Sequence, residues 1–184
     1  MKIAVIDTET TWGDEVMSIG MVIADGTDFS PIELKYYVID PVYKAGGLYS
    51  YEMFKYFKKE AQITTRVKAL KELDGWLKNH GVKQVYAYNA SFDKGHLKEF
   101  SSYEWYDIMR IAAYKQYNPF ITEDADCCKT GRLKRAYGVE PMTRLISGNQ
   151  RYLETHNALQ DALDELDIMR MLDLPVNAYG VARL

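Results

Sequence analysis

The first hydrophobic run of the chain is short and ends in two acidic residues. Ile3 to Ile6 is rich in β-branched residues and contains no polar residue, which predicts a strand buried on both faces. Asp7 and Glu9 follow it, and because side chains alternate along a strand, these two point the same way. Like charges this close repel unless a cation or a proton lies between them. The alternative is an ordinary polar strand end that runs into a turn.

The next apolar segments predict a hairpin and two further strands. Turn-forming residues at 25–28 separate two runs of strand character, so these two runs are expected to pair antiparallel. Two later runs also have strand character, which makes five strands with the first. The four segments are Val16–Ala24, Ile32–Ile39, Val82–Tyr88 and Trp105–Asp107.

Helical periodicity appears between and after these strands. Apolar residues recur every three or four positions from Val67 to Leu77, which predicts an amphipathic helix with Thr64 or Thr65 as its cap and an end near 79–81. A last long helix is expected to open at His156 and to stop before Pro175. Shorter helices are expected over 51–59, 91–100, 108–114 and 129–137, and Ser91 is the expected cap of the second of these. A loop is expected at 118–128 and irregular chain at 141–152.

This order of elements predicts one α/β domain with helices packed against a sheet. Of the 184 residues, 47% are hydrophobic and 27% are charged, as in globular proteins, and no apolar stretch approaches the length of a membrane span. A cytoplasmic location is the expectation, and the adjacent Cys127 and Cys128 are interpreted as two ordinary thiols. The net charge of −3 argues against coating of duplex phosphate, so any nucleic acid should be held over a short length.

Two further acids extend the pair at the end of the first strand. Asp93 follows the fourth strand at a helix start, and Asp161 lies in the first turns of the last helix. Because ligands of open α/β sheets bind beyond the carboxyl ends of the strands, these side chains are expected to meet. Four carboxylates carry a charge of −4, which two divalent cations would balance, and oxygen ligands suit Mg²⁺ or Mn²⁺.

His156 is the candidate base beside those acids. An imidazole titrates near neutral pH, so it can take the proton of an attacking water. Its offset of five residues from Asp161 is about 140° around a helix, which places it on the loop before the helix. Three other acids of that helix, Asp164, Glu165 and Asp167, are interpreted as a solvated face, and the remaining histidines as structural.

Three stretches together resemble the exonuclease motifs of the DEDDh family. They are Asp7-Thr8-Glu9-Thr10-Thr11, Asn89-Ala90-Ser91-Phe92-Asp93 and His156-Asn157-Ala158-Leu159-Gln160-Asp161-Ala162. The family comprises 3′→5′ exonucleases similar to the proofreading subunit of bacterial replicative polymerase, and the likeness extends from Met1 to Leu172. A sister group carries Tyr four residues before the final Asp, where this chain has Asn157. The His five residues before that Asp fits the histidine subgroup.

The resemblance implies a ribonuclease-H-like fold, with a central mixed five-stranded sheet flanked by helices and one exonuclease domain over 1–184. It implies that two ions, Mg²⁺ or Mn²⁺, are held by Asp7, Glu9, Asp93 and Asp161, and that His156 is the general base. It also implies a pocket for the terminal nucleotide. The candidate substrate contacts are Thr10 and Thr11 through their backbone, Trp12 where the family often has an aliphatic wedge, and Asn89 and Phe92.

The function expected from this set is hydrolysis of phosphodiester bonds at the 3′ end of single-stranded or frayed DNA or RNA. The products would be nucleoside 5′-monophosphates. DNA proofreading and a DNA polymerase partner are further expectations from the likeness. Two alternatives remain open, an exoribonuclease of the same family that trims RNA and a catalytically idle, polymerase-associated nucleic-acid-binding module.

Overall fold

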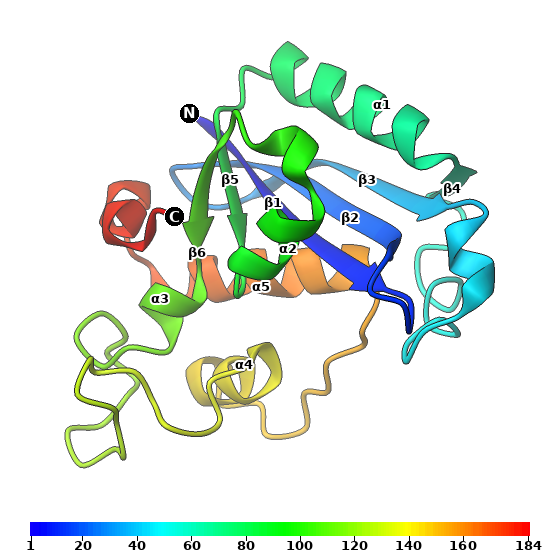
Figure 1. The fold of residues 1–184 in the computed structure, drawn as a ribbon. Helices are drawn as coiled ribbons and strands as arrows, with labels where there is room; N and C mark the ends of the chain where they lie inside the picture. The colour runs from blue at the N-terminus through cyan, green and yellow to red at the C-terminus, as the bar shows by residue number, and fades with distance from the viewer.

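A six-stranded mixed sheet forms the centre of the molecule (Figure 1). The structure is a computed structural model that describes all 184 residues. The strands lie in the order β4-β3-β2-β1-β5-β6; β1, β2 and β3 pair antiparallel, and the other neighbours pair parallel. The strands are β1 (Lys2–Thr10), β2 (Val16–Asp25), β3 (Pro31–Ile39), β4 (Ala61–Thr64), β5 (Gln84–Ala87) and β6 (Glu104–Asp107). The predicted hairpin and the mixed α/β sheet are confirmed.

The strand that the sequence did not predict is β4. It pairs with the second half of β3, from Tyr36 to Ile39, at the edge of the sheet. Only four residues long and half polar, it gives no period to recognise. The predicted total of five strands is therefore wrong by one. The helix predicted over 51–59 is wrong as well, because that segment is a series of turns.

Helices cover both faces of the sheet and enclose two hydrophobic cores. The helix α1 packs on one face, and α5 with α4 packs on the other. None of the helices combines the length and the apolar character that crossing a membrane requires. The α-helices are α1 (Arg66–Asn79), α2 (Ser91–His96), α3 (Met109–Ala112), α4 (Val139–Ser147) and α5 (Ala158–Leu172), and the 3₁₀ turns are η1 (Val42–Ala45), η2 (Lys98–Phe100) and η3 (Val176–Ala182).

Two predictions between β6 and α5 are wrong, one of a helix and one of irregular chain. The segment 129–137 contains no helix, because Arg132 and Leu133 form isolated β-bridges with Tyr114 and Cys127. Tertiary pairing has overridden its weak helical pattern. The helix α4 instead occupies 139–147, although irregular chain was expected from Pro141 onward. Its Pro141 falls in the first turn, where a missing backbone N–H costs nothing.

The starts of α2 and α5 also differ in detail from expectation. Ser91 is the first residue of α2 and not its cap, since no side chain caps this helix. The helix α5 begins at Ala158, and Asn157 caps it by accepting a hydrogen bond from the backbone N–H of Gln160 at 3.3 Å. Consequently His156 lies on the chain before the helix.

Candidate active site

The strand β1 and the helix α2 bring the first three acids together. Asp7 and Glu9 lie within β1 near its carboxyl end, and Asp93 is buried in the first turn of α2. Asp93 Oδ1 accepts a hydrogen bond of 2.7 Å from the hydroxyl of Thr8. This bond ties α2 to β1. The two elements lie close together because β5, the strand that leads into α2, is the parallel neighbour of β1.

A glycine allows α5 to bring Asp161 to the same place. Gly20 on β2 lies opposite Asp7 in the antiparallel pair. A Cβ added at Gly20 would lie 2.2 Å from backbone atoms of Ala158 and Leu159, so only glycine permits this contact. The amino end of α5 therefore rests directly on the sheet, and Asp161 in its first turn comes close to the acids of β1.

Three groups form the tightest part of the site. One oxygen of Glu9, one of Asp161 and one ring nitrogen of His156 all lie within 4.8 Å of one another. Asp7 and Asp93 lie outside this group but close to it. Repulsion from Asp93, Asp161 and Glu9 helps to raise the pKa of Asp7, and repulsion from Asp93 helps to raise that of Glu9. The five residues of the sequence constellation thus converge from three elements, β1, α2 and α5, and the loop segment before α5.

Tyr49 is a site residue that the sequence did not single out. Its ring stacks on the imidazole of His156, with centroids 3.7 Å apart and planes 14° apart. Tyr49 lies in the segment between η1 and β4, among 15 tyrosines in the chain. No spacing or motif distinguishes it, so only the folded chain identifies it.

Two acids predicted to be solvated are buried beside the site. Asp164 is 8% exposed and Glu165 is 2% exposed, so that prediction is wrong for both. They stand three and four residues after Asp161, on the helix face that packs on the sheet. Asp164 accepts hydrogen bonds from the hydroxyl of Tyr152 and from Gln160. Asp167, in contrast, is partly exposed and pairs with Arg170 at 2.9 Å, in keeping with a solvated position.

Burial and mutual repulsion raise the pKa values of the clustered carboxyl groups. Desolvation, followed by nearby Glu154, raises the pKa of Glu9 to about 8 and that of Asp161 to about 9. Desolvation raises the pKa of Asp93 to about 7. The pKa values of Asp7 and Glu165 are also raised, first by burial and then by neighbouring acids. Without a cation, the cluster therefore retains protons near neutral pH.

The pKa of His156 shifts in the opposite direction and is lowered. Partial burial lowers the pKa of its imidazole, because desolvation disfavours the charged form of a base. The nearby carboxylates Glu140 and Glu52 oppose this shift. A neutral imidazole is the form that can accept a proton.

The donor set fits divalent metal ions with hard-ligand preference. Asp7 Oδ2 is buried and has no hydrogen-bond partner in the protein, and Glu165 Oε2 is in the same condition. An unpaired buried carboxylate oxygen is costly unless a proton or cation meets it. The neighbouring donors are carboxylate oxygens and one imidazole, a set that could hold a divalent metal ion.

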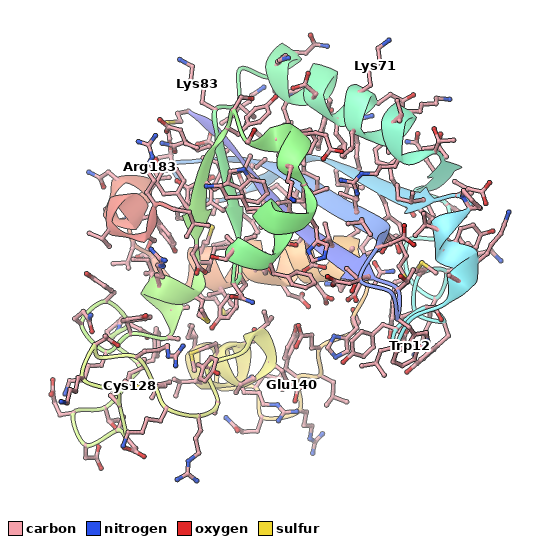
Figure 2. The ribbon with its side chains drawn as sticks, in the orientation of Figure 1. Trp12, Lys71, Lys83, Cys128, Glu140 and Arg183 are labelled. Carbon is pink, nitrogen blue, oxygen red and sulfur yellow. The ribbon has the colours of Figure 1, made fainter.

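A cavity of about 360 Å³ opens beside Glu9. Nine residues line it: Thr8, Glu9, Thr10, Thr11, Trp12, Asp14, Leu48, Tyr49 and Phe92. Trp12 is 73% exposed and lies at the lower right of the molecule in Figure 2, on the side away from Lys83.

Asn89 is the one predicted substrate contact that does not line this cavity. Its backbone adopts a positive φ of 61°, which asparagine tolerates better than most residues. Its backbone N–H donates a hydrogen bond of 3.0 Å to Asp107 Oδ1. This geometry gives Asn89 a role in the turn between β5 and α2.

Several solved structures of other proteins are similar in fold to this chain. No family model matches the chain. No curated protein matches it. Among solved structures, Exonuclease X in complex with 5′ overhanging duplex DNA is similar at 19% identity and a TM-score of 0.54, covering 97% of this chain and 93% of that one.

Two other solved structures are also similar to this chain in fold. The nuclease domain of 3′hExo, a DEDDh family member bound to rAMP, matches at 12% identity and a TM-score of 0.64, with 92% of this chain and 90% of that chain covered. E. coli Exonuclease I in complex with a dA16 oligonucleotide matches at 13% identity and a TM-score of 0.60; 98% of this chain and 41% of that chain are covered. The chain thus has the ribonuclease-H-like fold of the DEDDh 3′-exonucleases, as its three motifs predicted.

Proposed function

We propose that this protein is a metal-dependent 3′→5′ exonuclease that removes nucleotides from the 3′ end of single-stranded or frayed DNA or RNA. The observation that carries the proposal is the convergence of Glu9, His156 and Asp161 within 4.8 Å, with Asp7 and Asp93 beside them. The similar solved structures, which include complexes with DNA, support a nucleic-acid substrate. They give no support to the expected polymerase partner.

Asp7, Glu9, Asp93 and Asp161 would hold two divalent ions, Mg²⁺ or Mn²⁺. When bound, such a pair lowers the pKa of an attacking water and stabilises the leaving oxygen. The four carboxylates would lose their retained protons as the ions bind, since an adjacent cation favours the charged form. Metal affinity should therefore rise with pH across the range in which Glu9, Asp93 and Asp161 titrate.

His156 would act as the general base. Its lowered pKa keeps the imidazole neutral at physiological pH, so it can take the proton of the attacking water. Its place before α5 sets it beside Glu9 and Asp161, where the reacting phosphate would lie.

The cavity of about 360 Å³ would receive the terminal nucleotide. Backbone groups of Thr10 and Thr11 would meet the 3′ sugar, and Trp12 and Phe92 would offer aromatic faces to the bases. Stacking on an aromatic side chain is worth about 1–3 kcal/mol per base and tolerates any sequence. Hydrolysis of the last phosphodiester bond would release a nucleoside 5′-monophosphate and leave a shortened strand with a 3′ hydroxyl.

Purified protein should be incubated with 5′-labelled single strands of DNA and RNA, in Mg²⁺ or Mn²⁺, beside its His156→Ala variant. The expected result is a ladder of shortened labelled strands that requires metal and is about 10²–10⁴-fold slower in the variant. Nucleoside 5′-monophosphates should accumulate in proportion. Strands left uncut, or cut equally by the variant, would overturn the proposal.

Comparing the two strands in parallel separates DNA from RNA as the preferred substrate. Calorimetric titration of the protein with Mn²⁺ addresses the idle-module alternative, because an intact site should release protons and bind the ion. Absence of both binding and cleavage would leave only the nucleic-acid-binding alternative.

A further inference from the structure

The segment that carries Tyr49 is fastened to the end of β1. The backbone N–H of Trp12 donates a hydrogen bond of 3.2 Å to the carbonyl of Gly46. A Cβ added at Gly47 would lie 2.4 Å from the carbonyl oxygen of Thr10, so this segment and β1 are in backbone contact. Tyr49 follows two residues later, which places its ring at the cavity wall formed by Thr10 and Trp12.

The same segment is fastened to the residue after His156. The side-chain amide of Asn157 donates hydrogen bonds to the carbonyls of Glu52 at 3.1 Å and Met53 at 3.4 Å. The hydroxyl of Tyr36 on β3 also donates to the Met53 carbonyl, at 3.0 Å. All these groups are buried, so the connection between the 49–53 segment and the start of α5 is protected from water.

His156 itself has few other supports. Its backbone adopts a left-handed conformation with φ of 54°, an uncommon state for a residue other than glycine. The rings of the two other histidines make hydrogen bonds within the protein, whereas the His156 ring makes none. The face of the Tyr49 ring is therefore the contact that sets the plane of this imidazole.

We propose that Tyr49 is a positioning residue, which holds the His156 imidazole toward Glu9 and Asp161 and links the occupancy of the nucleotide cavity to the orientation of the base. The catalytic part of this inference rests on the proposed function. One ring serves both sides, because Tyr49 stacks on His156 and also lines the cavity with Trp12. A nucleotide in the cavity would press on that ring and restrict its motion, so the base would be aligned when substrate is present.

The first test observes the stack without requiring activity. Proton NMR of metal-free full-length protein with labelled histidine would follow three imidazoles, with His156 assigned by its loss in His156→Gln. The ring current of Tyr49 should shift the His156 ring protons upfield. Tyr49→Leu, which keeps apolar bulk without an aromatic ring, should return them downfield, and Tyr49→Phe should leave them in place. Unchanged His156 resonances in Tyr49→Leu would overturn the proposal.

The second test separates positioning from simple binding. Tyr49→Ala should lower kcat about 10–100-fold, up to the loss expected from a misplacement of about 1 Å, with a smaller change in KM. Tyr49→Phe should restore most of the rate, because it restores the stacked face. A rise in KM with kcat unchanged would overturn the positioning role and leave Tyr49 as a cavity wall only.

Tyr51→Ala is the matched control, since Tyr51 lies in the same segment and is 71% exposed. It should change neither the His156 resonances nor kcat. An effect equal to that of Tyr49→Ala would indicate that any change in this segment disturbs the site, and would overturn the proposal. If wild-type protein cuts no strand, the proposed function fails. The NMR result would still decide separately whether Tyr49 holds His156.

Discussion

The two long helices α1 and α5 cover opposite faces of the sheet but bury different kinds of residue. They have 14 and 15 residues, so their burial can be compared directly. The five buried residues of α1 are all apolar, whereas the ten of α5 include three acids. Burying a carboxylate costs free energy unless a proton, a hydrogen bond or a cation compensates it. The comparison indicates that α1 serves stability and that α5 gives up stability for the site.

The largest expected effect is a loss of activity from the acidic helix. Asp161→Asn should lower kcat by at least about 100-fold. Removing a residue that only hydrogen-bonds to a metal ligand already costs up to about 100-fold, so removing a ligand itself should cost no less. The same change should raise the thermal unfolding temperature of the metal-free protein, because it removes a buried acid whose pKa is raised to about 9. Single-turnover cleavage and thermal unfolding measure the two quantities. An active variant, or one of lower stability, would contradict the contrast between the helices.

The opposite pattern is expected from the apolar helix. Leu73 is fully buried against the sheet, and Leu73→Ala should lower the free energy of unfolding by about 2–5 kcal/mol. Activity per folded molecule should stay at the wild-type value, because α1 lies on the other face of the sheet from α5. Chemical denaturation and cleavage assays below the unfolding midpoint test this. A large loss of kcat in the folded variant would show that the two faces are coupled.

A third prediction concerns pH. The folded-state pKa values of Glu9, Asp93 and Asp161 are raised to about 8, 7 and 9, so the native state binds protons that the unfolded state releases. The stability they contribute is complete below pH about 4 and is lost as pH rises through 7–9, at about 1.4 kcal/mol for each unit by which a pKa is raised. Metal-free protein should therefore unfold at lower temperature at pH 9 than at pH 6.

Magnesium should reverse this trend, since a bound cation favours the ionised carboxylates. The increase in unfolding temperature on adding Mg²⁺ should be larger at pH 9 than at pH 6. Unfolding scans with and without the ion at both pH values measure the difference. Equal stabilisation at the two pH values would argue that these acids are not the groups that meet the ion.

The smallest expected effect comes from Glu165, which is buried but is not proposed as a metal ligand. Glu165→Gln keeps the shape of the side chain and removes the ionisable group whose pKa burial raises. It should stabilise the metal-free protein at pH 8, with each kcal/mol gained appearing as about 2–4 °C in unfolding temperature. A lower unfolding temperature would show that the Glu165 carboxyl group is better satisfied than its unpaired Oε2 suggests. Glu60→Gln, on an exposed residue, is the matched control.

Local patterns predicted the elements whose residues have one dominant period. The apolar spacing of α1 and its Thr65 cap could be read from the sequence. The strands β1 to β3 could be read as well, because they are apolar or alternating runs that end at polar or turn-forming residues. The same reasoning failed for β4 and for 129–137, where pairing with distant chain decides the conformation. Asp164 and Glu165 were misread because charge normally indicates a solvated helix face, whereas here both side chains are buried.

The sequence by itself determined the kind of site, because its acids and His156 are specific in type and order and their likeness to known motifs needs no coordinates. Only the tertiary structure decided how these groups meet. Gly20 lets α5 rest on β1 and β2, and the fastened 49–53 segment brings Tyr49 onto His156. The physical reason is that residue type carries chemistry locally, whereas contact between distant segments depends on backbone approach and burial, for which the linear order gives no distance.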